Sequence, residues 1–234
     1  AGCHADGAAP AGAVSVHAPA QDDCLVCHHP HAGSRGLPRA PVPELCLKCH
    51  DESTPEFRAK HLGRGPAANC SGCHAPHHAT QPALLRARSH PGFAERACDT
   101  CHQDTTSVVP AREVCRGCHD GLVPAGLPEN RRHAPAADGD CTACHNPHVG
   151  DAAGLLSARR ASDACATCHD LDALRPVASL AHTPVREGRC EDCHDPHGSP
   201  QPALLPAAPG ALCFGCHVHL KAQHLTYGRH DIHR

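Results

Sequence analysis

Nine segments of the chain place two cysteines and one histidine at a fixed spacing, Cys-x-x-Cys-His, starting at residues 24, 46, 70, 98, 115, 141, 165, 190 and 213. Two thiols at this separation reach two carbons on one edge of a planar macrocycle. The adjacent histidine then supplies an imidazole to a metal at its centre. This spacing is the attachment signature of c-type haem. The sequence therefore predicts nine covalently bound haems.

The motif residues divide into thioether cysteines and proximal iron ligands. The cysteines assigned to thioether bonds are Cys24, Cys27, Cys46, Cys49, Cys70, Cys73, Cys98, Cys101, Cys115, Cys118, Cys141, Cys144, Cys165, Cys168, Cys190, Cys193, Cys213 and Cys216. The histidines assigned as proximal ligands are His28, His50, His74, His102, His119, His145, His169, His194 and His217. Zinc sites and disulfides are the alternatives for so many cysteines. Four-cysteine zinc sites need no histidine after each pair, and disulfides need neither feature, so haem is favoured.

The remaining cysteine, Cys3, is followed by His4, as at the end of a motif whose first cysteine is missing. We expect these two residues to belong to a tenth haem, with the first cysteine upstream or absent. A free thiol beside an unrelated histidine is the alternative. The chain starts at Ala1, without an initiator methionine or a hydrophobic signal segment, which we interpret as a processed or truncated product.

The second axial ligand of each iron must also be histidine, because the chain has 25 histidines and no methionine. Ten are used as proximal ligands if His4 is included, and the other fifteen suffice for ten distal positions. A methionine ligand raises the haem potential. Its absence therefore predicts six-coordinate, low-spin haems of low potential.

Four spare histidines lie three residues after a proximal histidine and directly after a proline: His31, His77, His148 and His197. Such a histidine is too close to pass around the macrocycle to its other face, and the proline ends any helix between the two imidazoles. We expect each to bind the iron of a neighbouring haem. A surface histidine in a turn is the alternative.

Another four precede a motif by seven to nine residues and are also assigned distal roles: His17, His61, His133 and His182. The last distal ligands come from a smaller set: His90, His219, His224, His230 and His233. His29 and His78 adjoin expected ligands, and we interpret them as lining a haem edge rather than binding iron.

The elements that position these residues must be short. The chain has 23 prolines, 20 glycines and only four aromatic residues, too little apolar material for a core of side chains. We expect a mostly irregular fold with short α-helices, little or no β-sheet and a core of stacked haems, and therefore an unfolded apoprotein. Residues 83–88 and 152–160 are the segments expected to form one or two helical turns.

The motifs are grouped in pairs along a single predicted domain, residues 1–234. The paired units are residues 17–50, 61–102, 133–169 and 182–217. Single motifs lie at residues 1–4 and 115–119, and a histidine-rich tail occupies 218–234. Arginines between the paired motifs are candidate partners for haem propionates, or solvated surface charges: Arg35, Arg39, Arg86, Arg88, Arg159 and Arg160.

The doubled motif, from His17 to His217, resembles that of multihaem c-type cytochromes. The resemblance implies covalent haem, haem pairing and electron transfer. Relatives of this kind act as periplasmic carriers, as haem chains in outer-membrane porins or as subunits of extracellular filaments. We expect an exported, extracellular or cell-surface filament subunit that hands electrons to redox proteins or external acceptors, with a periplasmic or porin-associated carrier as the alternative.

Other classes of function are less compatible with the sequence. A multihaem reductase requires an iron with an open position, often with lysine in place of the motif histidine, and no Cys-x-x-Cys-Lys occurs. We therefore expect no enzymatic activity. The net charge of −3 indicates no nucleic-acid partner. No apolar run approaches the ~20 residues of a membrane span.

Overall fold

A computed structural model describes residues 9–31, 38–61, 69–103, 110–174 and 181–221. Cys3, His4, His224, His230 and His233, which the sequence analysis singled out, lie outside the described residues. The chain divides into two compact units. Unit 1 consists of residues 1–108 and 144–159, and unit 2 consists of residues 109–143 and 160–234.

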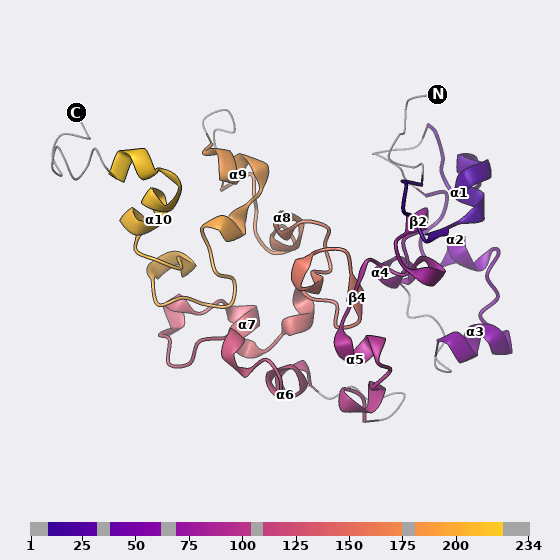
Figure 1. The fold of residues 1–234 in the computed structure, drawn as a ribbon, viewed down its shortest axis with the longest axis horizontal. Helices are drawn as coiled ribbons and strands as arrows, with labels where there is room; N and C mark the ends of the chain where they lie inside the picture. Colours follow the sequence, from indigo (N-terminus) through magenta and orange to yellow (C-terminus); the bar gives the residue numbers. More distant parts are fainter. Residues whose placement is uncertain (1–8, 32–37, 62–68, 104–109, 175–180, 222–234) are drawn as a thin grey trace. The chain divides into compact units, whose positions relative to one another are not determined.

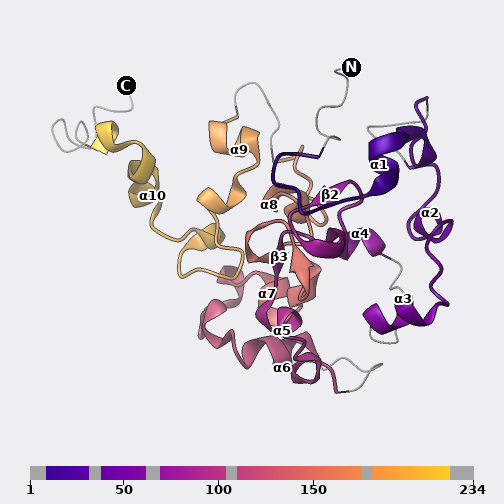
Figure 2. The ribbon, with the colours of Figure 1, turned by 45° about the vertical axis from the view of Figure 1, so that its right-hand side comes forward.

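Both units consist of short elements joined by irregular chain (Figures 1 and 2). Unit 1 contains β1 (Ser15–Val16), α1 (Ala18–Asp22), η2 (Cys24–Val26), α2 (Glu44–Leu47), α3 (Pro55–Lys60), α4 (Cys70–Cys73), β2 (His78–Ala79), η3 (Pro82–Leu84), β3 (Arg88–Ser89), α5 (Pro91–Ala94), η4 (Cys98–Thr100), β4 (Val149–Gly150) and η8 (Ala153–Leu155), where η denotes a 3₁₀ turn. Unit 2 contains α6 (Ala111–Arg116), η5 (Asp120–Leu122), η6 (Glu129–Arg131), α7 (Ala134–Asp138), η7 (Cys141–Ala143), α8 (Ala161–Cys165), α9 (Thr183–Glu187), η10 (Cys190–Asp192), η11 (Pro202–Leu204) and α10 (Pro209–Cys216).

Proline and glycine set the length of these helices. A proline occupies the first turn of α1, α3, α5, α7, α9 and α10, where its fixed φ fits and its missing N–H costs nothing. Gly139 and Gly188 end α7 and α9 in the left-handed conformation, at φ 81° and 74°, as helix C-termini favour. Even α10 has only eight residues. The prediction of an irregular chain with short helices is confirmed.

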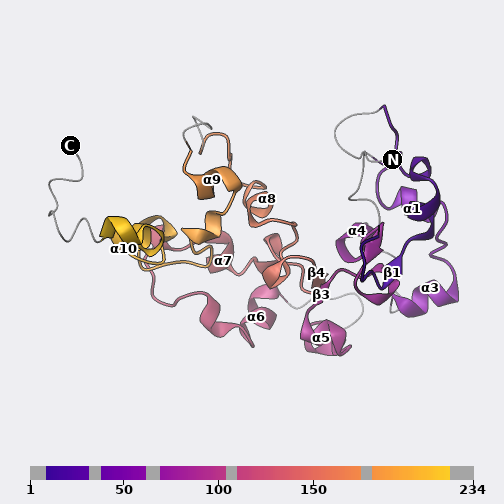
Figure 3. The same ribbon diagram turned by 45° about the horizontal axis from the view of Figure 1, so that its top comes forward.

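Two ladders of two residues each are the sheet structure of the described chain, and both lie in unit 1 (Figure 3). β1 pairs with β2, and β3 pairs with β4, both antiparallel. Each ladder continues into a pair of histidines. The amide of His17 donates to the carbonyl of His77 at 2.9 Å, and the amide of His90 donates to that of His148 at 2.8 Å. The ladders thus hold candidate ligands side by side.

Side chains alone form almost no core. Among the described residues, the buried hydrophobic side chains are Ala79 and Val149, both in strands. Leu25 and Val26, inside the first motif, remain 47% and 50% exposed. Burial of apolar surface drives folding, so this chain needs a further apolar partner, as its composition predicts.

The predicted helices at residues 83–88 and 152–160 are wrong. Each segment instead starts with a single 3₁₀ turn, η3 or η8, that contains two residues with positive φ. These are Ala83 and Leu84 at 55° and 57°, and Gly154 and Leu155 at 63° and 55°. Left-handed residues cannot continue a right-handed helix. The same turn recurs in η11, at Ala203 and Leu204, with φ of 53° and 58°.

This small core leads to a prediction about the apoprotein. Protein produced without haem attachment should show no cooperative thermal transition in far-ultraviolet circular dichroism, because little apolar area opposes the entropy of the free chain. The haem-loaded protein is the control and should unfold cooperatively. A sharp transition in the apoprotein would mean that the chain folds on its own contacts.

Candidate haem-binding sites

Each motif is closed by one turn of helical backbone. In eight of the nine, the amide of the motif histidine donates to the carbonyl of the first cysteine at 2.8–3.0 Å: His28, His50, His74, His102, His119, His169, His194 and His217. The turn brings both cysteines and the histidine to one short stretch of surface. All eighteen described cysteines are free thiols, as thioether attachment requires.

Six motif histidines face a second histidine whose ring centre is about 6 Å away. In unit 1 these pairs are His17–His50 at 6.0 Å, His28–His77 at 5.9 Å, His61–His74 at 6.2 Å and His102–His148 at 5.9 Å. In unit 2 they are His133–His169 at 6.1 Å and His182–His217 at 6.0 Å. Every one of the second histidines is a distal candidate from the sequence.

Five of the six pairs follow one of two rules, and His61–His74 is the exception. A histidine that follows a motif faces a different motif, because His77 lies opposite His28 and His148 opposite His102. This is the arrangement expected from the three-residue spacing. A histidine that precedes a pair faces the second motif of that pair, as His17 does with His50. Two further pairs follow this second rule: His133–His169 and His182–His217.

Other candidates are placed differently. The ring of His31 lies 6.1 Å from that of His29, and the ring of His219 stands edge-on to His217 at 6.0 Å. His197 lies 3.7 Å from the carboxylate of Asp195. The assignment of these three as distal ligands stays a prediction.

His90 resembles the leading histidines His17, His61, His133 and His182 in its spacing, and it resembles His17 in its backbone contact. It precedes Cys98 by eight residues, the same spacing that separates His133 from Cys141 and His182 from Cys190. Its amide bonds the backbone of His148 just as that of His17 bonds His77. The eight-residue spacing was the available signal.

Three proximal histidines are held from behind by a backbone carbonyl. Nδ1 of His74 donates to the carbonyl of Ala83 at 2.8 Å. The equivalent bonds are His145 to Gly154 at 2.6 Å and His194 to Ala203 at 2.8 Å. In each case the acceptor lies nine residues after the histidine, in the left-handed turns of η3, η8 and η11. We call these three turns the carbonyl turns.

Two distal candidates are oriented in the same way. Nδ1 of His61 donates to the carbonyl of Phe57 at 2.8 Å, and the two rings stack at 4.1 Å. Nδ1 of His133 donates to the carbonyl of Pro196 at 2.9 Å. A proton on Nδ1 leaves the lone pair of Nε2 available for a metal.

Burial keeps one further candidate in the form that binds metals. The pKa of His77 is lowered chiefly by burial, and then by the neighbouring His28, His78 and His17. A lowered histidine pKa favours the neutral imidazole, and only the neutral ring can coordinate a metal.

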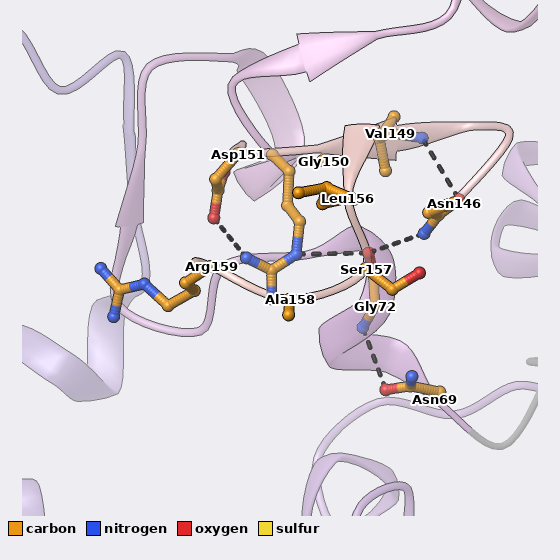
Figure 4. A pocket seen from close by; sticks show the side chains of 11 residues that line it. Asn69, Gly72, Asn146, Val149, Gly150, Asp151, Leu156, Ser157, Ala158 and Arg159 are labelled. Carbon is orange, nitrogen blue, oxygen red and sulfur yellow. Dashed lines mark hydrogen bonds and ion pairs between the residues drawn. The ribbon is translucent and has the colours of Figure 1, made fainter. Parts of the chain in front are cut away.

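Arg86 joins the motif at residues 70–74 to the segment after His145, beside the pocket that Figure 4 shows. Its guanidinium donates to the carbonyls of Ser71 and Gly72 and forms an ion pair with Asp151. The Asp151 carboxylate also accepts from the amide of Ala87 at 3.1 Å. These contacts border a cavity of about 110 Å³. The guanidinium is therefore engaged by protein groups, and its pairing with a haem propionate stays a prediction.

A comparison with known protein families matches the doubled CXXCH motif family at residues 17–55, 133–174 and 182–222, just over half of the chain. The chain belongs to the doubled CXXCH motif family. It is accordingly a multihaem c-type cytochrome, an electron carrier whose motif cysteines bind haem covalently. No curated protein sequence matches the chain.

The three matched segments contain the pairs that follow the second rule. Residues 61–102 lie outside the match. There, the leading His61 faces His74 of the first motif instead of His102 of the second. His102 faces His148, beyond the single motif. The unmatched unit thus differs from the others in its histidine partners as well as in its sequence.

The described residues contain neither a side-chain cluster for a metal ion nor a membrane-spanning helix. Within the described ranges, three or more histidine, cysteine or acidic side chains do not converge on any point that suits a metal ion. In the same ranges, no helix has the length and apolarity to cross a bilayer.

The role of Arg86 can be tested by Arg86→Ala. Removing charged hydrogen bonds from partly buried carbonyls should lower the free energy of unfolding by about 2 kcal/mol, measured by guanidinium unfolding of the haem-loaded protein. Arg88→Ala is the matched control, since Arg88 is exposed on β3, and should change stability by less than about 0.5 kcal/mol. Equal effects of the two variants would contradict the role of Arg86.

Proposed function

We propose that the protein is an electron conductor with nine to ten bis-histidine haems. The spacing of the six histidine pairs carries this proposal. A metal–imidazole bond is about 2.0 Å long and the ring centre lies about 1.2 Å farther, so imidazoles on opposite sides of one iron have centres about 6.4 Å apart. The six observed separations, 5.9–6.2 Å, fall just below this value. The residues therefore fit a haem iron between the two rings.

The chain's own residues have three tasks in this function. Motif cysteines attach the macrocycle, paired histidines supply both axial nitrogens, and backbone carbonyls hold Nδ1 of several of these rings. The bound group supplies reversible one-electron chemistry at iron. The protein lowers the reorganisation needed for that chemistry by fixing the ligands before and after the electron arrives.

Short connections between ligands support a continuous path for electrons. His74 and His77 are three residues apart, yet His74 faces His61 and His77 faces His28. In the proposed ligation they therefore bind two different haems. His145 and His148 repeat this relation with the haem on His102. Two haems whose ligands are so close along the chain must be neighbours, so an electron moves between them over a short distance.

Paired ligands also favour conduction over catalysis. A catalytic iron needs an open position for its substrate, whereas each of the six pairs fills both axial positions. We infer that the protein is not an enzyme.

We further propose that the protein works outside the cell or at its surface, as a subunit of a cytochrome filament. Support comes from the haem density and from the surplus histidines of residues 218–234, which suit ligation of a haem in the next subunit. A periplasmic or porin-associated carrier is the alternative, since it needs the same haem chemistry.

Bis-histidine ligation is tested by His77→Ala. Removing one axial nitrogen should turn one haem in about nine from low-spin to high-spin, a change measured by electron paramagnetic resonance of the oxidised protein. His78→Ala is the matched control and should leave the spectrum unchanged. A wholly low-spin spectrum of His77→Ala, with the full haem content, would refute this ligand assignment.

Filament formation is tested by electron microscopy of the native protein without crosslinking. We expect continuous filaments with a regular repeat. Replacing His224, His230 and His233 together by alanine should shorten or abolish them, because the proposed ligands between subunits are lost. Discrete particles from the native protein would instead favour the periplasmic or porin-associated carrier.

A further inference from the structure

We propose that the carbonyl turns are positioning elements that set the potential of the haems on their histidines below that of the haem on His102. This inference rests on the bis-histidine ligation proposed above. It concerns the backbone behind the ligands, not the ligands themselves.

The hydrogen bond fixes which ring nitrogen carries the proton. A carbonyl can only accept, so Nδ1 of His74 is the donor in its 2.8 Å bond to Ala83. Nε2 of that ring then has a free lone pair for iron. A ring N–H that donates to a carbonyl makes the opposite nitrogen more basic. A more basic ligand stabilises ferric over ferrous iron and lowers the potential.

The turn is held from both sides, which keeps the carbonyl in place. In the first copy, the carbonyl of Ala83 accepts a hydrogen bond from Nδ1 of His74. The carbonyl of Leu84 accepts another from the amide of Ala75 at 2.8 Å. The amide of Arg86 also donates to the carbonyl of Cys73 at 3.0 Å. The turn is therefore attached to the same motif whose histidine it orients.

Backbone strain indicates that this geometry is maintained against local preference. Alanine and leucine rarely adopt a positive φ, yet both do so in two of the three copies, at Ala83–Leu84 and Ala203–Leu204. In the remaining copy Gly154 takes the first position. Such strain persists only where the surrounding contacts over-determine it.

His102 offers the contrast. Its Nδ1 is buried and has no hydrogen-bond partner in the part of the chain that the structure describes. Its ring faces that of His148 at 5.9 Å, and Phe93 packs against His148 at 5.3 Å. Buried N–H groups without an acceptor are rare. Without the carbonyl, the ring donates less charge to iron, and this haem accepts an electron more readily.

The placement of His145 and His148 puts the proposed difference in potential between two neighbouring haems. His145 is held by the carbonyl of Gly154, and His148, three residues later, faces His102. A haem of lower potential thus lies next to one of higher potential. When the protein is partly reduced, the electron of that pair resides on the His102 haem, as ferrous iron beside a ferric neighbour.

The test uses two variants of Ala83 in the full-length, haem-loaded protein. Ala83→Val places a β-branched residue at a positive φ, which should break the turn. Ala83→Gly keeps the turn, as Gly154 does in the equivalent position. The readouts are a spectroelectrochemical titration and the Nδ1–H signals of ¹⁵N-histidine-labelled protein reduced with dithionite, because low-spin ferrous haem is diamagnetic.

We expect Ala83→Val to lose one exchange-protected Nδ1–H signal and to raise one redox component. The expected change is about tenfold in the ferrous-to-ferric ratio of that haem at a fixed potential, about 59 mV for a one-electron couple. Ala83→Gly should match the native protein. Unchanged signals and potentials in Ala83→Val with full haem content would overturn the proposal.

His148→Ala identifies the haem on His102, because that component leaves the low-spin population. In the native protein, the component identified in this way should have a higher potential than the component that Ala83→Val moves. A lower potential would overturn the proposal. No high-spin haem in His148→Ala would instead count against the ligation itself. If Ala83→Val fails to fold, Gly154→Val and its control Gly154→Ala make the same comparison at His145. A Cβ at Gly154 meets His145 Cε1 at an acceptable 3.6 Å.

Discussion

The whole structure depends on holding pairs of imidazole rings with their centres about 6 Å apart. Six such pairs occur in the described residues. An ordinary protein would place rings with a packed core, but in the described part of this chain the only buried hydrophobic side chains are those of Ala79 and Val149. The chain places them with backbone hydrogen bonds instead. Ladders of two residues, single helical turns and carbonyls behind Nδ1 are each small, and each acts within a few residues of a ligand.

Much of the site could be predicted from the sequence, because covalent attachment imposes a spacing that survives in the chain. The motifs specify the attachment cysteines and the proximal histidines without any knowledge of the fold. The proline before His77 and before His148 also specifies that these rings turn away from their own motif, since three residues cannot pass around a macrocycle. The structure places both rings opposite a different motif.

The sequence could not predict the carbonyl turns or the partners of the leading histidines. Residues 83–88 resemble a short helix by propensity, because alanine, leucine and arginine all favour one. Tertiary contacts with His74 override that preference and impose a positive φ on Ala83 and Leu84. The partner of His61 depends on three-dimensional placement too. It precedes the next motif by nine residues, against seven or eight for the other leading histidines, and it faces the first motif of its paired repeat and not the second.

The buried Nδ1 of His102 lies in the paired repeat of residues 61–102, the one that the family match leaves out. In the three matched segments, a leading histidine faces the second motif, so under the proposed ligation both ligands of that haem come from one paired repeat. The ring that faces His102, that of His148, comes from the next paired repeat along the sequence. Under the proposed ligation, this haem therefore has ligands from two different paired repeats. In the described chain, the ring of His102 also lacks the backbone carbonyl that three other proximal histidines have behind Nδ1. A repeat protein can vary one haem in this way while its other repeats keep their geometry, since several rings are held by backbone hydrogen bonds and not by a shared core.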